Sequence, residues 1–236
     1  MAKTVDKDRK AKIAEMQRQS RAADRRRTLT IVGAALVVVA LMGGAVTYAI
    51  VSDDNRVPGG ELAALGVSAA AASCDPVTSD PATGGGKHVE GTVKYATVPP
   101  SSGSHNGTPE YPNRGFYTAG DRPQMEKLVH NLEHGYTVLW YDGSTSAKQL
   151  ATLRAIGKKA NASTDAKEKF IVSAWDTAYG AFPAGKHFAL SHWSADPKDV
   201  KKQTGHRELC GDVSGATVES FIKAYPHTSA PEPGAQ

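Results

Sequence analysis

The sequence predicts an α/β or α+β domain with a small mixed sheet and packed helices, in the order β-α-β-α-β-β-α, preceded by one transmembrane helix. Three observations lead to this fold class. An uncharged apolar run fills residues 28–52, strand-like and helix-like segments alternate after it, and the 236 residues suit one domain with appendages. With glycine added, the apolar fraction of 40% lies in the usual range of folded proteins, which excludes wholesale disorder.

The positive charge of the chain is concentrated at its N-terminus. Residues 1–27 carry ten Lys or Arg and four Asp or Glu, a net charge of +6, whereas the whole chain carries +4. The remaining residues are therefore slightly acidic, and they contain no phosphate-binding glycine loop and no basic stripe. We accordingly expect no nucleic-acid partner, and we interpret the first 27 residues as a basic segment beside a membrane.

The segment 28–52 has the length and composition of a membrane anchor. Its 25 uncharged residues span about 37 Å as a helix, and a hydrocarbon core is about 30 Å thick. Arg25 to Arg27 flank one end and Asp53 the other, so the positive-inside rule places residues 1–27 in the cytoplasm. A cleaved signal peptide is the alternative, but its apolar part normally has about 7 to 15 residues. The sequence thus predicts a single-pass protein of the cell membrane with its C-terminal domain outside.

Two cysteines mark the ends of the predicted outer domain. We expect a linker over 53–73, a globular domain over 74–226 and a disordered tail over 227–236. An oxidising compartment favours a disulfide between Cys74 and Cys210. Two free thiols or soft metal ligands are the alternative, although neither cysteine has a Cys or His partner at metal-ligand spacing.

The regular elements of the domain follow from hydrophobic periodicity and from cap and turn residues. Period-2 alternation predicts strands, and apolar residues three or four apart between a cap and a glycine predict helices. A loop over 101–121, rich in Gly, Ser, Asn and Pro, is long enough that we expect it to be functional. In chain order the patterns give a strand over 88–98, a helix over 122–134, a strand over 136–141, a helix over 146–160, strands over 170–175 and 187–193, and a helix over 215–225.

The strongest chemical signal lies on the predicted helix 122–134, where His130, Glu133 and His134 share one stripe. At about 100° per residue these side chains lie apart from the apolar stripe of the same helix. Two histidines four residues apart can bind one transition-metal ion, and an imidazole nitrogen suits copper or zinc. The sequence therefore predicts a copper or zinc site on this helix.

Two ligands do not complete such a site. The best further candidates are His105 in the long loop and His88 at the start of the first strand, whereas His187, His192 and His206 have no motif around them. The alternative is that the helix histidines only hydrogen-bond to neighbouring loops and interact with the helix dipole. In that case the domain is an envelope binding or structural module without metal.

Four runs of residues in the outer domain resemble a known bacterial family. These runs are HVEGTVKY from His88, PPSSGSH up to His105, GFY from Gly115 and VHNLEHGYTVLWY from Val129. In this order they are similar to the membrane-anchored, actinobacterial-type family known only as domain of unknown function 3105. The resemblance covers about residues 74–225 and implies an outward-facing domain behind one transmembrane helix, with no established activity to carry over. It places all five candidate residues inside shared motifs, namely His88, His105, His130, Glu133 and His134.

A shorter resemblance concerns His130, Glu133 and His134, whose spacing is similar to the His-x-x-Glu-His pattern of inverzincin metallopeptidases. It implies zinc on the histidines and Glu133 as the general base that activates a bound water. Glu208 is the downstream carboxylate that would act as the distant third ligand. Three functions therefore stay open, which are metal binding, zinc-dependent hydrolysis and a metal-free module, and the sequence identifies no protein partner.

Overall fold

The structure is a computed structural model that describes Glu15 and residues 61–235. Within this part of the chain, six strands form one mixed sheet in the order β1-β6-β5-β3-β4-β2. Strand β4 pairs in parallel with β3 and β2, and the other pairs are antiparallel. The strands are β1 (Thr78–Pro81), β2 (Phe116–Tyr117), β3 (Thr137–Tyr141), β4 (Phe170–Ala174), β5 (Phe188–Asp196) and β6 (Asp199–Cys210).

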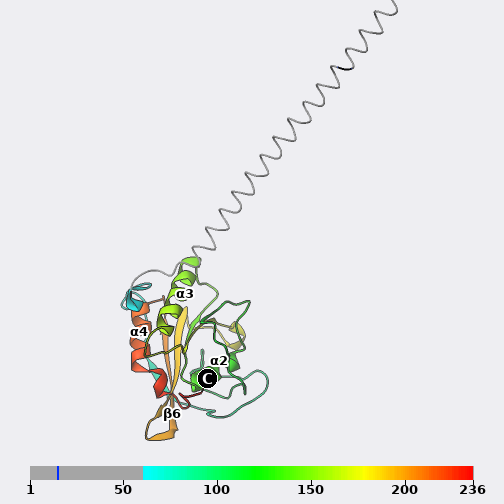
Figure 1. Cartoon of the computed structure of the whole chain (residues 1–236), viewed down its shortest axis with the longest axis vertical. Coiled ribbons are helices and arrows are strands. Elements are labelled where there is room, and N and C mark those ends of the chain that lie inside the picture. The colour runs from blue at the N-terminus through cyan, green and yellow to red at the C-terminus, as the bar shows by residue number, and fades with distance from the viewer. Residues whose placement is uncertain (1–14, 16–60, 236) are drawn as a thin grey trace, which may run out of the picture. The chain divides into compact units, whose positions relative to one another are not determined.

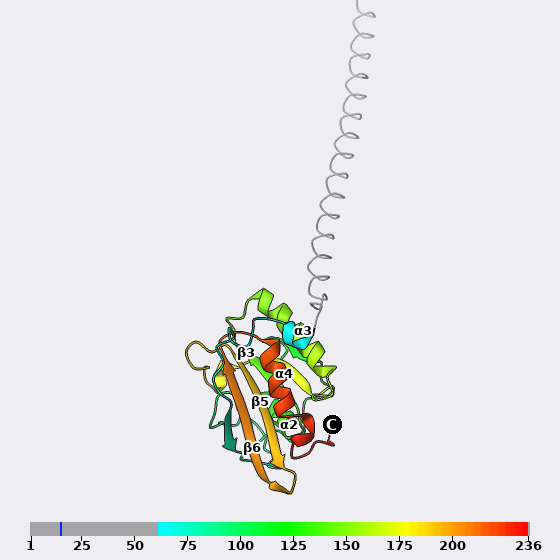
Figure 2. The same ribbon diagram turned by 90° about the vertical axis from the view of Figure 1, so that its left-hand side faces the viewer.

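Helices cover both faces of this sheet. Helix α2 (Met125–Glu133) packs on one face, and α3 (Ala147–Asn161) and α4 (Gly215–Ala224) pack on the other. Figure 1 shows the sheet nearly edge-on between the two layers, and Figure 2 shows α4 in front of the sheet, beside β5 and β6. The predicted α/β class, a mixed sheet with packed helices, is confirmed for the described residues.

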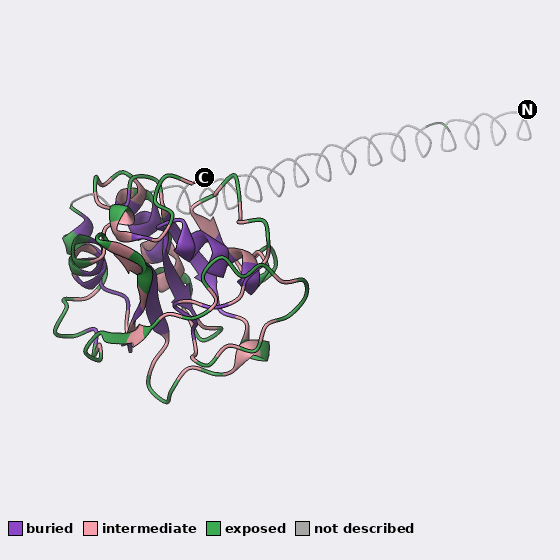
Figure 3. Cartoon of the chain, turned by 90° about the horizontal axis from the view of Figure 1, so that it is seen from below, coloured by how far each residue is buried: buried purple, intermediate pink, exposed green. Residues whose placement is uncertain are grey.

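The alternation of side chains along β3 explains why the core has two halves. Val138 and Trp140 face α2, whereas Leu139 and Tyr141 face α3 and α4, as the period of two in a strand requires. All residues of β3 and β4 are buried, which is typical of strands covered on both faces. Figure 3 shows these central strands and α2 as the buried part of the domain, surrounded by exposed loops.

Helix α3 connects the parallel strands β3 and β4, because parallel neighbours need a long crossover. The side chain of Ser146 accepts from the backbone N–H of Gln149, and the Gln149 side chain accepts from the N–H of Ser146. This reciprocal capping box fixes the start of the helix. The predicted boundary at Ser146 therefore agrees closely with the structure.

The predicted strand over 88–98 is wrong. Only His88 forms a bridge there, and its partner is His105 rather than a sheet strand. The N–H of Val93 donates to the carboxylate of Glu126, and Tyr95 packs against the α2 half of the core. The segment is thus an extended loop on the surface of the domain, because the His105 loop and the Glu126 side chain, rather than a strand of the sheet, bond to its backbone groups.

The pattern rules missed β1, β2 and the 12-residue β6. Exposed lysines such as Lys201 and Lys202, together with Gly205, hide the alternation in β6. Strands β1 and β2 contain only 4 and 2 residues, so they present too few positions for a period to show.

The folded unit begins before the predicted boundary at Cys74. Leu62 in η1 (Leu62–Ala64), together with Leu65 and Ala72, is buried, and η1 packs against α4. At the other end, the segment predicted as a disordered tail contains η3 (His227–Ser229) and makes defined contacts up to Ala235. Both ends of residues 61–235 therefore take part in the fold.

A disulfide joins Cys74 to Cys210, as predicted, with an S–S distance of 2.04 Å. Disulfides are typical of extracytoplasmic domains. The predicted transmembrane segment 28–52 and the basic segment 1–27 fall outside the residues described, apart from Glu15. In the described part of the chain, no helix has the length and apolar character needed to span a bilayer.

Candidate metal centre

Four side chains from three separate segments converge beside α2. They offer one potential ligand atom each, and these atoms all lie within 4.8 Å of one another. Two come from α2 itself, one from the long loop and one from the extended segment that precedes the loop. The group, called the inner cluster below, consists of His88, His105, His130 and Glu133.

Backbone hydrogen bonds bring the loop segments to the helix. The N–H of Val89 donates to the carbonyl of His105 (2.8 Å), and the N–H of His105 donates to the carbonyl of Lys87 (3.1 Å). The N–H of Asn106 donates to the carbonyl of Glu126 at the start of α2 (3.3 Å). These bonds align the His88 and His105 segments in parallel across the polar face of the helix.

Two of the imidazoles are oriented by backbone carbonyls. Nδ1 of His105 donates to the carbonyl of Gly103 (2.8 Å), and Nδ1 of His130 donates to the carbonyl of Asn106 (2.6 Å). A carbonyl only accepts, so in the neutral ring the proton sits on Nδ1 and the lone pair on Nε2; that of His130 lies 2.9 Å from Nε2 of His134. A metal-binding histidine normally has this second contact, which fixes its tautomer and its direction.

His105 has a buried nitrogen that is not satisfied by hydrogen bonding. Its side chain is fully buried, and Nε2 lies 3.0 Å from Oε2 of Glu133. This contact is an ion pair when the ring is protonated, whereas Nε2 of the neutral ring has no aligned hydrogen-bond partner. A buried polar atom without a partner is costly. A cation held between this nitrogen and the carboxylate would satisfy both atoms.

The protonation states inside the cluster suit metal binding. Burial lowers the pKa of His130 to about 4, with smaller contributions from neighbouring histidines, so its ring is neutral at pH 7. Burial would raise the pKa of Glu133, but the neighbouring His105 and the N–H of Gly86, which donates to Oε1 at 2.7 Å, hold it below its usual value. Neutral imidazole and ionised carboxylate are the ligand forms that a cation requires.

The polar stripe predicted for this helix is present, but the long loop buries it. His105 is 0%, Glu133 2% and His130 5% exposed, and only His88 is exposed to solvent. Burial removes water that would otherwise compete for these atoms, so the group is not a solvated helix face. The functional role expected for the loop 101–121 has a physical basis here, because this loop supplies His105 and the carbonyl groups that orient the rings.

His134 lies beside the inner cluster rather than within it. Its Nε2 is 2.9 Å from Nε2 of His130, and the two rings meet edge to face with centroids 4.4 Å apart. On its other side, Oε2 of Glu232 lies 3.5 Å from the same nitrogen. The structure thus places four of the five predicted residues in one group and His134 next to it.

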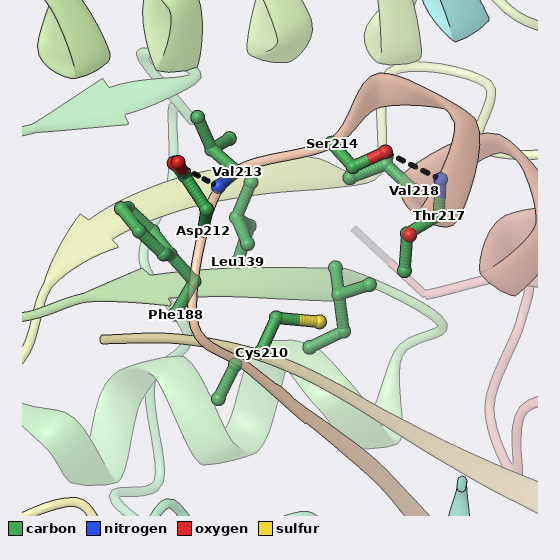
Figure 4. Close-up of a pocket in the computed structure, with 10 residues that line it drawn as sticks. Leu139, Phe188, Cys210, Asp212, Val213, Ser214, Thr217 and Val218 are labelled. Atoms are coloured by element: carbon green, nitrogen blue, oxygen red, sulfur yellow. Dashed lines mark hydrogen bonds between the residues drawn. The ribbon is translucent and has the colours of Figure 1, made fainter. Parts of the chain in front are cut away.

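Glu208, the sequence candidate for a distant zinc ligand, lies elsewhere. It is near the Cys74–Cys210 disulfide, and Cys210 belongs to the half of the core on the α3 and α4 face. Figure 4 shows Cys210 in the lining of a small pocket on that face. The pocket holds only about 10 Å³, room for one water at most, so it is not a ligand site.

The three histidines without a motif also lie outside the inner cluster. Nδ1 of His187 lies 2.8 Å from the carboxylate of Asp142, which forms an ion pair when the ring is protonated. His192 and His206 are buried and hydrogen-bond to hydroxyl groups of Thr137, Ser229, Ser79 and Ser194. Hydrogen bonding in the core accounts for the latter two.

A comparison with protein families gives a match to the family described as "Protein of unknown function (DUF3105)", over residues 88–236. This match covers more than half of the chain and includes every residue of the inner cluster, so the chain belongs to this family. Neither a curated protein nor a solved structure matches the chain significantly.

Proposed function

We propose that this member of the DUF3105 family is a membrane-anchored protein whose outward domain binds one copper or zinc ion in the inner cluster. The observation that carries the proposal is the orphaned Nε2 of His105, fully buried and facing the carboxylate of Glu133. A lone pair and an anionic oxygen repel each other unless a positive charge lies between them, either a proton on Nε2 or a metal ion. A metal ion supplies that charge and also takes the ligand atoms of His88 and His130, which a proton does not.

The donor set favours a transition metal. Three imidazoles and one carboxylate are suitable ligands for zinc and copper, whereas calcium and magnesium prefer oxygen alone. Four protein donors can complete the tetrahedral shell that zinc adopts in closed sites. The set therefore fits binding or handling of the ion better than a catalytic centre, which keeps one coordination position open for water.

The hydrolase interpretation receives less support. A general base must stand off the metal and face its water, but Glu133 offers a ligand atom to the same group as His130. The second histidine of the motif, His134, lies outside the inner cluster, and Glu208 is near the disulfide. We therefore give Glu133 the role of a metal ligand.

The proposed location is the cell envelope. The apolar segment 28–52 would serve as a single-pass anchor, with residues 1–27 in the cytoplasm and the domain outside. The Cys74–Cys210 disulfide supports an oxidising environment for the domain. The membrane is the partner that this arrangement requires, and no nucleic-acid partner is proposed.

The test is metal binding by the purified full-length protein in detergent. Elemental analysis and calorimetric titration with zinc and copper should give one ion per chain. His105→Asn should weaken binding by more than about 100-fold, because even partners outside the ligand shell cost about 10- to 100-fold. The matched control is His187→Asn, which changes a histidine outside the cluster and should bind as the parent does. A protein that binds neither metal would overturn the proposal.

A further inference from the structure

The C-terminal strap, defined here as residues 226–235, is tied to the end of helix α2. The Nζ of Lys169 donates to the carbonyls of Pro233 (2.9 Å) and Ala235 (2.6 Å), and also to the carbonyl of His134 (2.7 Å). The N–H of Glu232 donates to the carbonyl of Glu133 (3.0 Å). The strap is therefore fixed against two residues of the His-x-x-Glu-His motif.

A glycine makes this close approach feasible. Gly135 has a φ of +93°, and a Cβ there would lie 2.4 Å from the carbonyl oxygen of His227. Any other residue would push the strap away from the helix end. The glycine that ends α2 thus also serves the packing of the strap.

The strap places one carboxylate beside the histidine that lies outside the inner cluster. Oε2 of Glu232 is 3.5 Å from Nε2 of His134, whose own distance to Nε2 of His130 is 2.9 Å. The Glu232 side chain is 56% exposed, whereas that of His134 is 8% exposed. Potential ligand atoms therefore follow one another from the solvent to the buried donors.

From this series of neighbouring ligand atoms we propose that His134 and Glu232 form an outer metal position. A zinc or copper ion would pass through this position when it enters or leaves the inner cluster. The inference rests on the proposed metal-binding function. A carboxylate and an imidazole are suitable ligands for these ions, and an exposed negative charge also raises the local concentration of cations. His130 links the two positions because its Nε2 contacts His134 and belongs to the inner cluster.

An outer position has a kinetic signature that an inner ligand lacks. Once the inner cluster holds the ion, the ion no longer contacts Glu232. Glu232 therefore affects the rate of metal exchange and not the stability of the final complex. A substitution of Glu232 must then change the association and dissociation rate constants by the same factor, because their ratio is the dissociation constant, which stays unchanged. Removal of an inner ligand instead changes the dissociation constant itself.

His88 offers a competing route, since it is the exposed member of the inner cluster. Uptake past His88 would bypass the strap completely. The rates of a Glu232 variant therefore distinguish the two routes.

The experiment is stopped-flow measurement of zinc uptake and of zinc release to an excess of chelator, with the full-length protein and Glu232→Gln. The variant keeps the backbone hydrogen bond to Glu133, and its native near-ultraviolet spectrum would verify the fold. We expect both rates to fall by about tenfold, the lower end of electrostatic effects on association, with an unchanged dissociation constant. The control is Glu219→Gln, which removes an equal charge from α4 on the other face of the sheet and should leave both rates unchanged.

Unchanged rates in Glu232→Gln would overturn the outer position, and so would a dissociation constant that rises in step with a faster release. Both results would leave the inner cluster as a metal site. A parent protein that takes up no zinc or copper would instead contradict the proposed function, and the outer position would fail with it.

Discussion

Nε2 of His105 and Oε2 of Glu133 lie 3.0 Å apart in side chains that are only 0% and 3% exposed to solvent. Because Nδ1 of His105 donates to Gly103, Nε2 faces the carboxylate with a lone pair when the ring is neutral and with a proton when the ring is charged. The neutral ring and the carboxylate repel each other, and a proton or a metal ion between the two atoms makes their contact favourable. The contact therefore links the stability of the domain to metal binding.

The first prediction concerns Glu133→Gln. A glutamine amide can donate to Nε2 of His105 while its oxygen still accepts from Gly86, so the metal-free variant should be at least as stable as the metal-free parent. Zinc at about 1,000 times its dissociation constant should stabilise the parent by about 4 kcal/mol. The variant should lose most of this gain. Thermal denaturation with chelator and with zinc measures both effects.

A Glu133→Gln variant that still binds zinc with the parent's affinity would contradict the ligand role. If that variant also lost a hydrolytic activity shown by the parent, Glu133 would act as a general base instead. The same variant therefore distinguishes the two functions that the sequence suggests for this residue.

The second prediction concerns the disulfide between Cys74 and Cys210, which are 136 positions apart in the sequence. In the chain-entropy account, closing so long a loop removes conformational entropy from the unfolded state and raises its free energy by about 5 kcal/mol. Replacing both cysteines with serine should lower the free energy of unfolding by about this amount. Denaturant titration measures the loss, with the reduced parent as the comparison. An unchanged midpoint would show that the bridge has no structural role.

The third prediction concerns the acid side of the stability curve. Burial lowers the pKa of His206 to about 4, well below the value of about 6.5 in an unfolded chain. The unfolded state therefore binds the proton first, and the contribution of His206 is fully present above about pH 6.5 and is lost as the pH falls towards about 4. His206→Gln keeps a side chain that can hydrogen-bond with Ser79 and Ser194 but does not titrate, so its unfolding free energy should depend less on pH in this window. Equal slopes for parent and variant would refute this account.

The fourth prediction has the opposite sign. Burial raises the pKa of Glu208 to about 7, so the folded state holds its proton more tightly than the unfolded state, where the carboxyl titrates near 4.3. Stability from this group is therefore present at low pH and falls as the pH rises through about 4.3 to 7. Glu208→Gln should be more stable than the parent at pH 8 and about equal to it at pH 4. A variant that is less stable at both values would contradict the prediction.

The elements with strong local signals could be predicted from the sequence. The capping box at Ser146 fixes the start of α3, and the apolar runs of β3 and β4 mark buried strands. Helical spacing was enough to place His130 and Glu133 on one side of α2. These features depend on residues that are close together in the sequence, so a local sequence pattern is enough to predict them.

The remaining features depend on contacts between distant segments. The alternation over 88–98 is real, but Glu126 and the His105 loop take up its backbone groups, so no strand forms. The carbonyl groups that orient His105 and His130 belong to the backbone, so the amino-acid sequence does not indicate them. Lys169 and Glu232 lie in no recognisable motif. The polar composition of 227–236 predicts disorder, whereas in the structure Lys169 binds three backbone carbonyl groups that hold this segment in place.

X-ray absorption at the zinc edge of the zinc-loaded protein tests the central claim most directly. The inner cluster predicts about three imidazole nitrogens and one carboxylate oxygen, with zinc–nitrogen distances of about 2.0–2.1 Å. His105→Asn should remove one imidazole from the spectrum or abolish the bound zinc. A shell that contains sulfur at about 2.3 Å, or a spectrum with no bound imidazole, would contradict the account.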